Sequence, residues 1–279
     1  MTANVRVIVE NDADTATLSA SPALVTTLPV TNLQNVSRCG VARTSSTADQ
    51  EILGTWSADR CLSHCTLYRH NLTSDGTVQL ELFSGASQTG SLLYDSGAVD
   101  AHPIKALGDM DLVYDPLATS VFTGWEWAFT SIWFDALWCR SFRLTLSDGS
   151  NAAGYLQASR LVLGRHFEPL NNFSYGVEMA WDEGTQSSRT EGGSLRSENT
   201  ESFRRIKFSL NRLNDGERAR VTELTRVLGR RKDFFVSCYP TVGGAKERDY
   251  SAVCKFSSIP PLVHPVYGVY AAQFQVEEI

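Results

Sequence analysis

The chain has 279 residues, of which 42% are hydrophobic and 20% are charged. This length suits two ordinary domains with cores of their own, and the composition excludes a disordered protein. The formal net charge of −6 argues against a nucleic-acid-binding protein. No apolar run approaches the roughly 20 residues that a membrane helix needs. We therefore expect a globular protein with no nucleic-acid partner and no membrane insertion.

The first six residues lack the charged-then-apolar plan of a signal peptide, which predicts folding in a cytoplasm. The six cysteines contain no C-x-x-C pair. Cys238 and Cys254 fall in strand-like patterns, where a free cysteine is usually a small buried hydrophobe, although a disulfide stays an alternative. The five histidines have no metal-ligand spacing, so no metal and no cofactor is predicted.

Short strand patterns fill the first part of the chain. They cover residues 63–68, 77–83, 91–94, 141–146 and 155–163, and turns rich in Gly, Ser and Asp separate them. Such short strands without a convincing long helix predict a β-sandwich over residues 1–165. Gly164 and Pro169 mark a connector, so residues 166–279 are expected to form a second domain.

An aromatic run at residues 122–138 holds four of the six tryptophans. Three interpretations stay open: a sandwich core, a protein interface, or a platform on which a sugar ring stacks. Trp125, Trp127 and Trp133 have mixed spacings, so all three cannot share one strand face. These three residues are the candidate interface or glycan contacts.

Two acidic patterns invite a catalytic or metal interpretation. Asp109, Asp111 and Asp115 lie close together, but the glycine and terminal glutamate of an EF-hand loop are missing. We expect a solvated loop there. Glu126 and Asp135 could be imagined as a glycosidase pair, yet a chain with 31 carboxylates offers many such pairs. No catalytic residue is predicted, and the protein is not expected to be an enzyme.

The second part opens on two alternating runs, residues 173–181 and 203–210, joined by a polar stretch at 182–200. They predict a hairpin arm at about 173–210. Arms of this kind are either surface loops or segments that become ordered against a neighbouring subunit. Arg189, Leu195 and Arg196 are the candidate inter-subunit contacts.

A helix is predicted at residues 214–228. Asn214 and Glu217 match a capping box, and Val221, Leu224 and Leu228 form an apolar stripe. Gly229 supplies a left-handed C-terminal residue. Further strands are expected at residues 233–239, 250–256 and 270–276, so this domain is a β-sheet structure with one flanking helix.

Two groups of segments resemble structural proteins of tailed bacteriophages. Residues 67–72, 78–85 and 93–97 resemble the galactose-binding-like jelly rolls found in them. Residues 203–208, the helix and residues 234–240 are similar to the tail-tube fold, a β-sandwich with a flanking helix and a long hairpin. The resemblance implies a mainly β protein in which a jelly-roll domain precedes a ring-forming, tail-tube-like domain.

The same resemblance implies a function. A distal tail protein of a long-tailed phage is a non-enzymatic virion component, made in the host cytoplasm, that forms a ring at the tail tip or baseplate. Its implied partners are copies of itself, expected as a hexamer, the tail-tube protein, and baseplate hub and fibre proteins. The alternative is a carbohydrate-binding adhesin module that recognises a host-surface glycan. A glycan-cleaving enzyme is the third and weakest interpretation.

Overall fold

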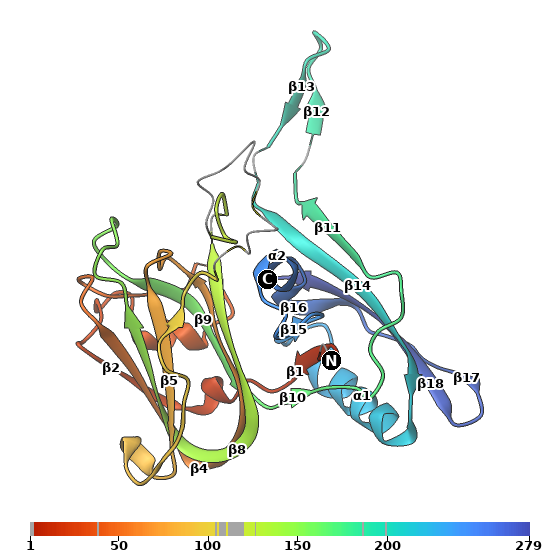
Figure 1. Cartoon of the computed structure of the whole chain (residues 1–279). Coiled ribbons are helices and arrows are strands. Elements are labelled where there is room, and N and C mark those ends of the chain that lie inside the picture. Colours follow the sequence, from red (N-terminus) through yellow and green to blue (C-terminus); the bar gives the residue numbers. More distant parts are fainter. Residues whose placement is uncertain are drawn as a thin grey trace. The chain divides into compact units, whose positions relative to one another are not determined.

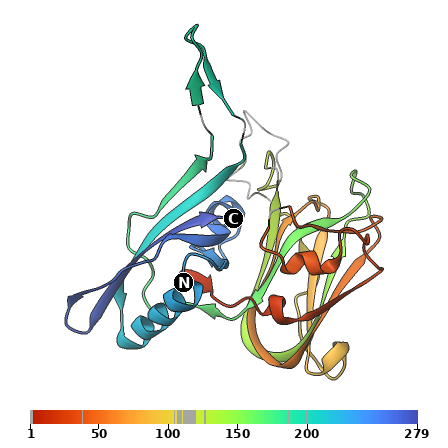
Figure 2. The ribbon, with the colours of Figure 1, turned by 180° about the vertical axis from the view of Figure 1, so that it is seen from behind.

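The computed structural model describes residues 3–37, 39–103, 105, 110, 120–125, 127–185, 187–198 and 200–279. The Asp109, Asp111 and Asp115 cluster and Glu126 lie outside these residues. The chain is mainly β and divides into two compact units (Figures 1 and 2). The first unit comprises Met1–Glu168 and Phe234–Ser251, and the second comprises Pro169–Asp233 and Ala252–Ile279.

Eight antiparallel strands build the sandwich of the first unit. They are β2 (Thr17–Ser21), β3 (Ala42–Arg43), β4 (Gln50–His70), β5 (Thr77–Phe83), β6 (Leu92–Asp95), β7 (Val99–Asp100), β8 (Ala128–Ser147) and β9 (Gln157–Gly164). Their order is β3-β9-β4-β8-β5-β6, with β2 on β4 and β7 on β5. Three short 3-10 helices accompany them: η1 (Asp12–Thr15), η2 (Val30–Gln34) and η3 (Ala86–Gln88).

Two long, bent strands, β4 and β8, contribute to both layers of this sandwich. β4 pairs with β8 from Gln50↔Leu146 to His70↔Ala128, with register shifts along the way. The first part of β4 also pairs with β2, whereas its last part pairs with β9. Figure 1 shows β4 and β8 curving together. The core between the layers includes Trp56, Leu62, Leu67, Leu80, Phe142, Leu144, Leu161 and Leu163. The predicted β-sandwich is confirmed, but the expected short strands at 63–68 and 141–146 are parts of these longer ones.

Three neighbouring strands of a second sheet also belong to the first unit. β1 (Arg6–Ile8) lies between β10 (His166–Phe167) and β15 (Phe234–Ser237), and helix α2 (Gly244–Asp249) follows β15. The predicted strand at 233–239 is therefore present, but it belongs to the first unit, which differs from the expected division at residue 165. The reason is its pairing with β1, a strand more than 220 residues away in sequence that the sequence patterns did not reveal.

The second unit contains strands in the order β16-β18-β14-β11, and β17 pairs with the first part of β18, whereas β16 pairs with its last part. The strands are β11 (Glu178–Glu183), β14 (Ser202–Leu213), β16 (Ser251–Ser258), β17 (Leu262–Val266) and β18 (Val269–Glu278). The predicted strands at 203–210 and 270–276 are confirmed with longer bounds, and the strand predicted at 250–256 is found one residue later, as β16. Ile206, Phe208 and Leu210 of β14 are buried, as their alternation predicts.

Helix α1 (Asp215–Leu228) packs beside β14 and β18 and has the predicted ends. The Asn214 side chain accepts from the Glu217 backbone N–H at 2.9 Å, and the Glu217 carboxylate accepts from the Asn214 N–H at 2.8 Å. Gly229 at the other end has a φ of +52°. Val221, Leu224 and Leu228 are buried, so the predicted capping box and apolar stripe are both confirmed.

Replacing Leu224 with alanine should lower the free energy of unfolding by about 2–5 kcal/mol, because it removes a core side chain and leaves a cavity. Arg220→Ala, at an exposed position of the same helix, should cost less than about 0.5 kcal/mol. Urea unfolding followed by circular dichroism measures both changes. Equal losses for the two variants would show that the helix stripe is assigned incorrectly.

The predicted arm is a hairpin whose strands are exposed toward its tip (Figure 1). β12 (Ser187–Arg189) pairs with β13 (Leu195–Ser197), and Gly193 takes a φ of +80° in the turn between them. Within the expected arm, the Ser174 N–H donates to the Ser209 carbonyl oxygen at 2.9 Å, and the ladder of β11 with β14 begins at Glu178. The alternating residues before that position lie in no strand, and Tyr175 among them is fully exposed.

All six cysteines are free, and four of them, including Cys238 and Cys254, are buried. This agrees with the prediction that the strand cysteines fill the core. Neither α1 nor α2, the helices in the described part of the chain, is long and apolar enough to cross a membrane.

Candidate functional site

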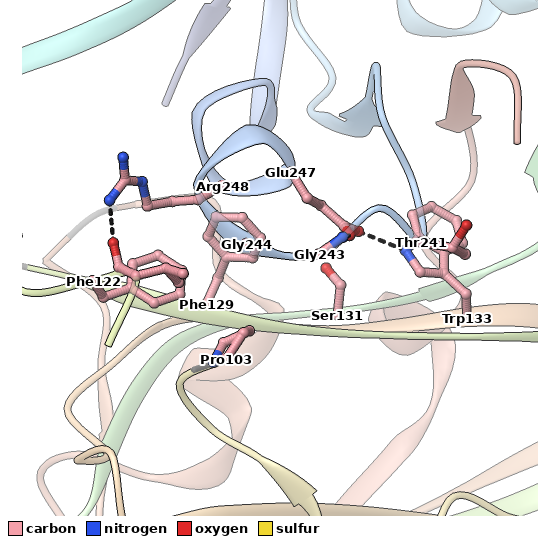
Figure 3. Close-up of a pocket in the computed structure, with 11 residues that line it drawn as sticks. Pro103, Phe122, Phe129, Ser131, Trp133, Thr241, Gly243, Gly244, Glu247 and Arg248 are labelled. Atoms are coloured by element: carbon pink, nitrogen blue, oxygen red, sulfur yellow. Dashed lines mark hydrogen bonds between the residues drawn. The ribbon is translucent and has the colours of Figure 1, made fainter. Parts of the chain in front are cut away.

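A cavity of about 210 Å³ lies within the first unit (Figure 3). Four segments line it: Pro103 after β7, the residues just before β8, β8 itself, and the loop that carries α2. The lining side chains and backbone come from Pro103, Val121, Phe122, Phe129, Ser131, Trp133, Thr241, Gly243, Gly244, Glu247 and Arg248. Residues more than 100 positions apart in the sequence therefore meet at one pocket.

One face of β8 supplies the aromatic wall. Phe129, Ser131 and Trp133 are two residues apart, so their side chains emerge on the same side of the strand. The Phe122 ring packs edge-on against Phe129 with centroids 5.3 Å apart. Both phenylalanines are buried and Trp133 is half-buried. The wall offers apolar ring faces with the Ser131 hydroxyl between them.

Glu247 fixes the loop of α2 against this wall. The Trp133 Nε1–H donates to Glu247 Oε1 at 3.0 Å, and the backbone N–H of Gly243 donates to Oε2 at 2.9 Å (Figure 3). Gly243 has a φ of +69°, which a residue without a Cβ adopts at little cost. Each carboxylate oxygen keeps a lone pair that can accept a hydrogen bond from a ligand.

Arg248 closes the other end of the pocket and is neutralised by its neighbour. Its Nη1–H donates to the carbonyl oxygen of Val121. Its Nε and Nη2 lie 2.8 and 2.7 Å from Asp249 Oδ1. The guanidinium also lies 4.4 Å from the ring centroid of Trp125, within cation–π distance. Arg248 and Asp249 thus form an ion pair of zero net charge.

A buried polar chain supports the wall from behind. Ser131 Oγ lies 2.8 Å from Thr66 Oγ1, which lies 2.8 Å from His64 Nε2. The His64 ring packs 3.9 Å from the Trp133 ring, measured between centroids. Burial holds the pKa of His64 well below its usual range, so the ring is neutral at pH 7. This chain fixes the position of Trp133 without adding charge.

A second set of side chains resembles a catalytic triad. Ser63 Oγ lies 2.6 Å from His166 Nδ1, and His166 Nε2 lies 3.6 Å from Glu168 Oε2. Ser63 is fully buried, however, and its oxygen also accepts the backbone N–H of His166 at 3.0 Å. The Ser63 hydroxyl is also not among the groups that line the pocket. A nucleophile needs an approach for its substrate, so we assign this set a structural role.

The predicted tryptophans are divided by the fold. Trp133 lines the pocket and Trp125 contacts Arg248 beside it. Trp127 is not among the residues that line the pocket, and its ring centroid lies 5.7 Å from the Arg69 guanidinium. Trp125 and Trp127 precede β8 and Trp133 lies within it, which explains why their spacing matches no single strand face. On the second unit, Arg189, Leu195 and Arg196 come together near the tip of the arm, and all are exposed.

Sequence reasoning missed Glu247 and Arg248. No local pattern marks them, because their role depends on β15 joining the first unit. The described residues contain no group of acidic, His or Cys side chains that could hold a metal ion. The Asp109 cluster and Glu126 lie outside the described residues, and Asp135 is an exposed residue of β8.

No family model and no curated protein matches the sequence. Similar solved structures include chitosan-binding module 1 of a chitosanase/glucanase from Paenibacillus sp. IK-5, with 10% identity and a TM-score of 0.40, over 55% of this chain and 98% of that one. The family 32 carbohydrate-binding module of Clostridium perfringens NanJ, in complex with galactose, has 11% identity and a TM-score of 0.37, over 57% and 98%. The family 32 module of AlyQ, in complex with 4,5-unsaturated mannuronic acid, has 15% identity and a TM-score of 0.35, over 53% and 92%.

At these identities and scores, the resemblances carry no conclusion about the ligand of this chain. The three similar structures are carbohydrate-binding modules and not tail proteins. The tail-tip role therefore stays a prediction.

Proposed function

We propose that the first unit is a non-enzymatic glycan-binding module and that the pocket beside Trp133 is its binding site. The observation that carries the proposal is the pairing of apolar ring faces with hydrogen-bonding groups in one cavity. A sugar ring presents C–H groups on its faces and hydroxyls on its rim. The faces match Phe129 and Trp133, and the rim matches the Ser131 and Thr241 hydroxyls and the Glu247 carboxylate.

The experiment requires the whole chain. A fragment of residues 1–165 lacks the part of the pocket that comes from residues 241–248, so it is unsuitable for a binding test. Glycan-array screening of the full-length protein identifies a binding saccharide, and calorimetric titration measures its affinity.

Trp133→Ala should weaken saccharide binding about tenfold or more, because it removes a stacking face and the hydrogen bond that holds Glu247. Trp138→Ala is the matched control: this tryptophan is 66% exposed and lies outside the pocket lining. Thermal melts show whether either variant is misfolded. Absence of any glycan binding by the wild type, or an equal loss in the control, would contradict the proposal.

A second candidate function is assembly into a larger particle, and a specific feature of the second unit favours it. Along the first part of β18, where β16 does not pair, the sheet ends at β17, and its other edge is β11. Every residue of β17 is exposed, and large apolar side chains gather on its hairpin: Ile259, Leu262, Val263, Val266 and Tyr267. At the opposite edge, Trp181 of β11 is 50% exposed. Exposed apolar edges of this kind usually become covered by a partner.

For this candidate, identical copies would join head to tail and close into a ring, expected as a hexamer, at the tip of a phage tail. The tail-tube protein and the baseplate hub and fibre proteins are its expected partners, and the arm with Arg189, Leu195 and Arg196 is its expected subunit contact. The virion is the expected location. Glycan binding by the first unit is compatible with such a role.

Val263→Asp should convert an assembled species to the monomer, because it places a charge in the apolar edge. Leu92→Asp, at an exposed apolar position on β6 of the first unit, should leave the mass unchanged. Light scattering across micromolar concentrations measures both. A strictly monomeric wild type, alone and with a tail-tube protein, would contradict assembly.

A further inference from the structure

Of the two charged residues that line the described part of the pocket, one has an ion-pair partner and the other does not. Among the described residues that line it, only Glu247 and Arg248 are charged. Arg248 is paired with Asp249 at 2.7 Å, so its charge is balanced within the loop. Glu247 receives hydrogen bonds only from neutral donors, the Trp133 indole and the Gly243 backbone, and forms no ion pair among the described residues.

The groups behind the wall do not compensate for this carboxylate. Arg6 lies 5.1 Å from the Trp133 ring centroid, but its Nε is 2.7 Å from Glu168 Oε2 in an ion pair of its own. Burial lowers the pKa of His64 and of His166, so both rings are neutral at pH 7. Lys246, the neighbour of Glu247 on α2, does not line the pocket, and its Nζ lies 4.0 Å from the ring centroid of Tyr239. Among the described lining residues, Glu247 is therefore the charged group that has no ion-pair partner.

We infer that the pocket selects neutral saccharides and rejects acidic ones, and that Glu247 determines this specificity. The inference rests on the proposed glycan-binding function. A sugar hydroxyl can donate to the free lone pairs of the Glu247 carboxylate, whereas a uronate would place a second carboxylate in a partly enclosed, aromatic-lined cavity beside it. No cation with uncommitted charge lines the described part of the pocket to receive it. Specificity of this kind comes from repulsion of the wrong ligand more than from attraction of the right one.

The test compares a charged sugar with its neutral ester, which differs from it by the loss of the charge and the gain of one methyl group. Galacturonic acid and its methyl ester are titrated into the full-length protein at pH 7 and low ionic strength. We expect the ester to bind at least about tenfold more tightly than the acid, and we expect added salt to reduce the difference. Equal affinities, or tighter binding of the acid, would overturn the inference and leave the proposed glycan-binding function standing. Failure of every saccharide to bind would overturn both.

A substitution of Glu247 tests whether this residue causes the preference for the ester. Glu247→Gln removes the charge at nearly constant shape and should reduce the preference for the ester severalfold. Glu183→Gln, on the exposed arm of the second unit, is the charge-matched control and should keep the full preference. An unchanged preference in a folded Glu247→Gln protein would show that another group sets the specificity. If this variant does not fold, the ester and acid comparison on the wild type still decides the inference.

Discussion

Replacing Glu278 with alanine should lower the free energy of unfolding of the second unit by about 3–5 kcal/mol. Glu278 on β18 holds Arg204 on β14 in a two-pronged ion pair, with Nε–Oε2 and Nη2–Oε1 both at 2.9 Å. The side chains are only 2% and 8% exposed. Removal of the carboxylate leaves the Arg204 cation buried without its counter-ion, which costs far more than loss of a surface pair.

The neighbouring residue provides the control. Glu277 pairs with Arg205 at 3.3 Å, but these side chains are 37% and 40% exposed, so Glu277→Ala should cost less than about 1 kcal/mol. Because the chain has two units, a single unfolding transition is not assured. Hydrogen exchange of the β14 and β18 amides, read by mass spectrometry, reports on the second unit alone. Equal protection loss in both variants would contradict the assignment.

Acidification below pH 6.5 should destabilise the first unit through its buried histidines. Burial lowers the pKa of His70 to about 3, and burial also holds the pKa of His64 well below its usual value. Between the unfolded value of 6.5 and the folded value, the unfolded chain binds a proton that the folded chain does not. Stability therefore falls with falling pH in this window, by about 1.4 kcal/mol per pH unit for each histidine.

His70→Asn should reduce that slope by the contribution of one histidine. Urea unfolding at pH 7.5 measures the packing cost of the substitution, and repetition at pH 5 measures the titration separately. Asp12 acts in the opposite direction, since burial raises its pKa from 3.8 to about 6 and its contribution to stability is lost as pH rises through that range. Asp12→Asn removes this opposing effect. Parallel pH dependences for the wild type and His70→Asn would contradict the prediction.

Local patterns by themselves determined much of the fold. The end residues of α1 follow from Asn214, Glu217 and Gly229, because caps satisfy backbone groups within a few residues of one another. The strands at 77–83 and 203–210 follow from alternation, since neighbouring side chains on a strand point to opposite faces. The sequence also predicted that Cys238 and Cys254 are free and that a hairpin arm follows the first domain.

Long-range pairing decided the rest. The partner of β15 is β1, at the other end of the chain, so residues 234–251 joined the first unit and brought Glu247 and Arg248 to β8. The sequence identified Trp133 as a candidate contact, but it did not identify the carboxylate that binds its indole N–H. Strand patterns specify which face is apolar and leave the identity of the neighbouring strand open. Which strands become neighbours depends on the shape of the whole core. The position of the pocket follows from that pairing, so only the tertiary structure decided it.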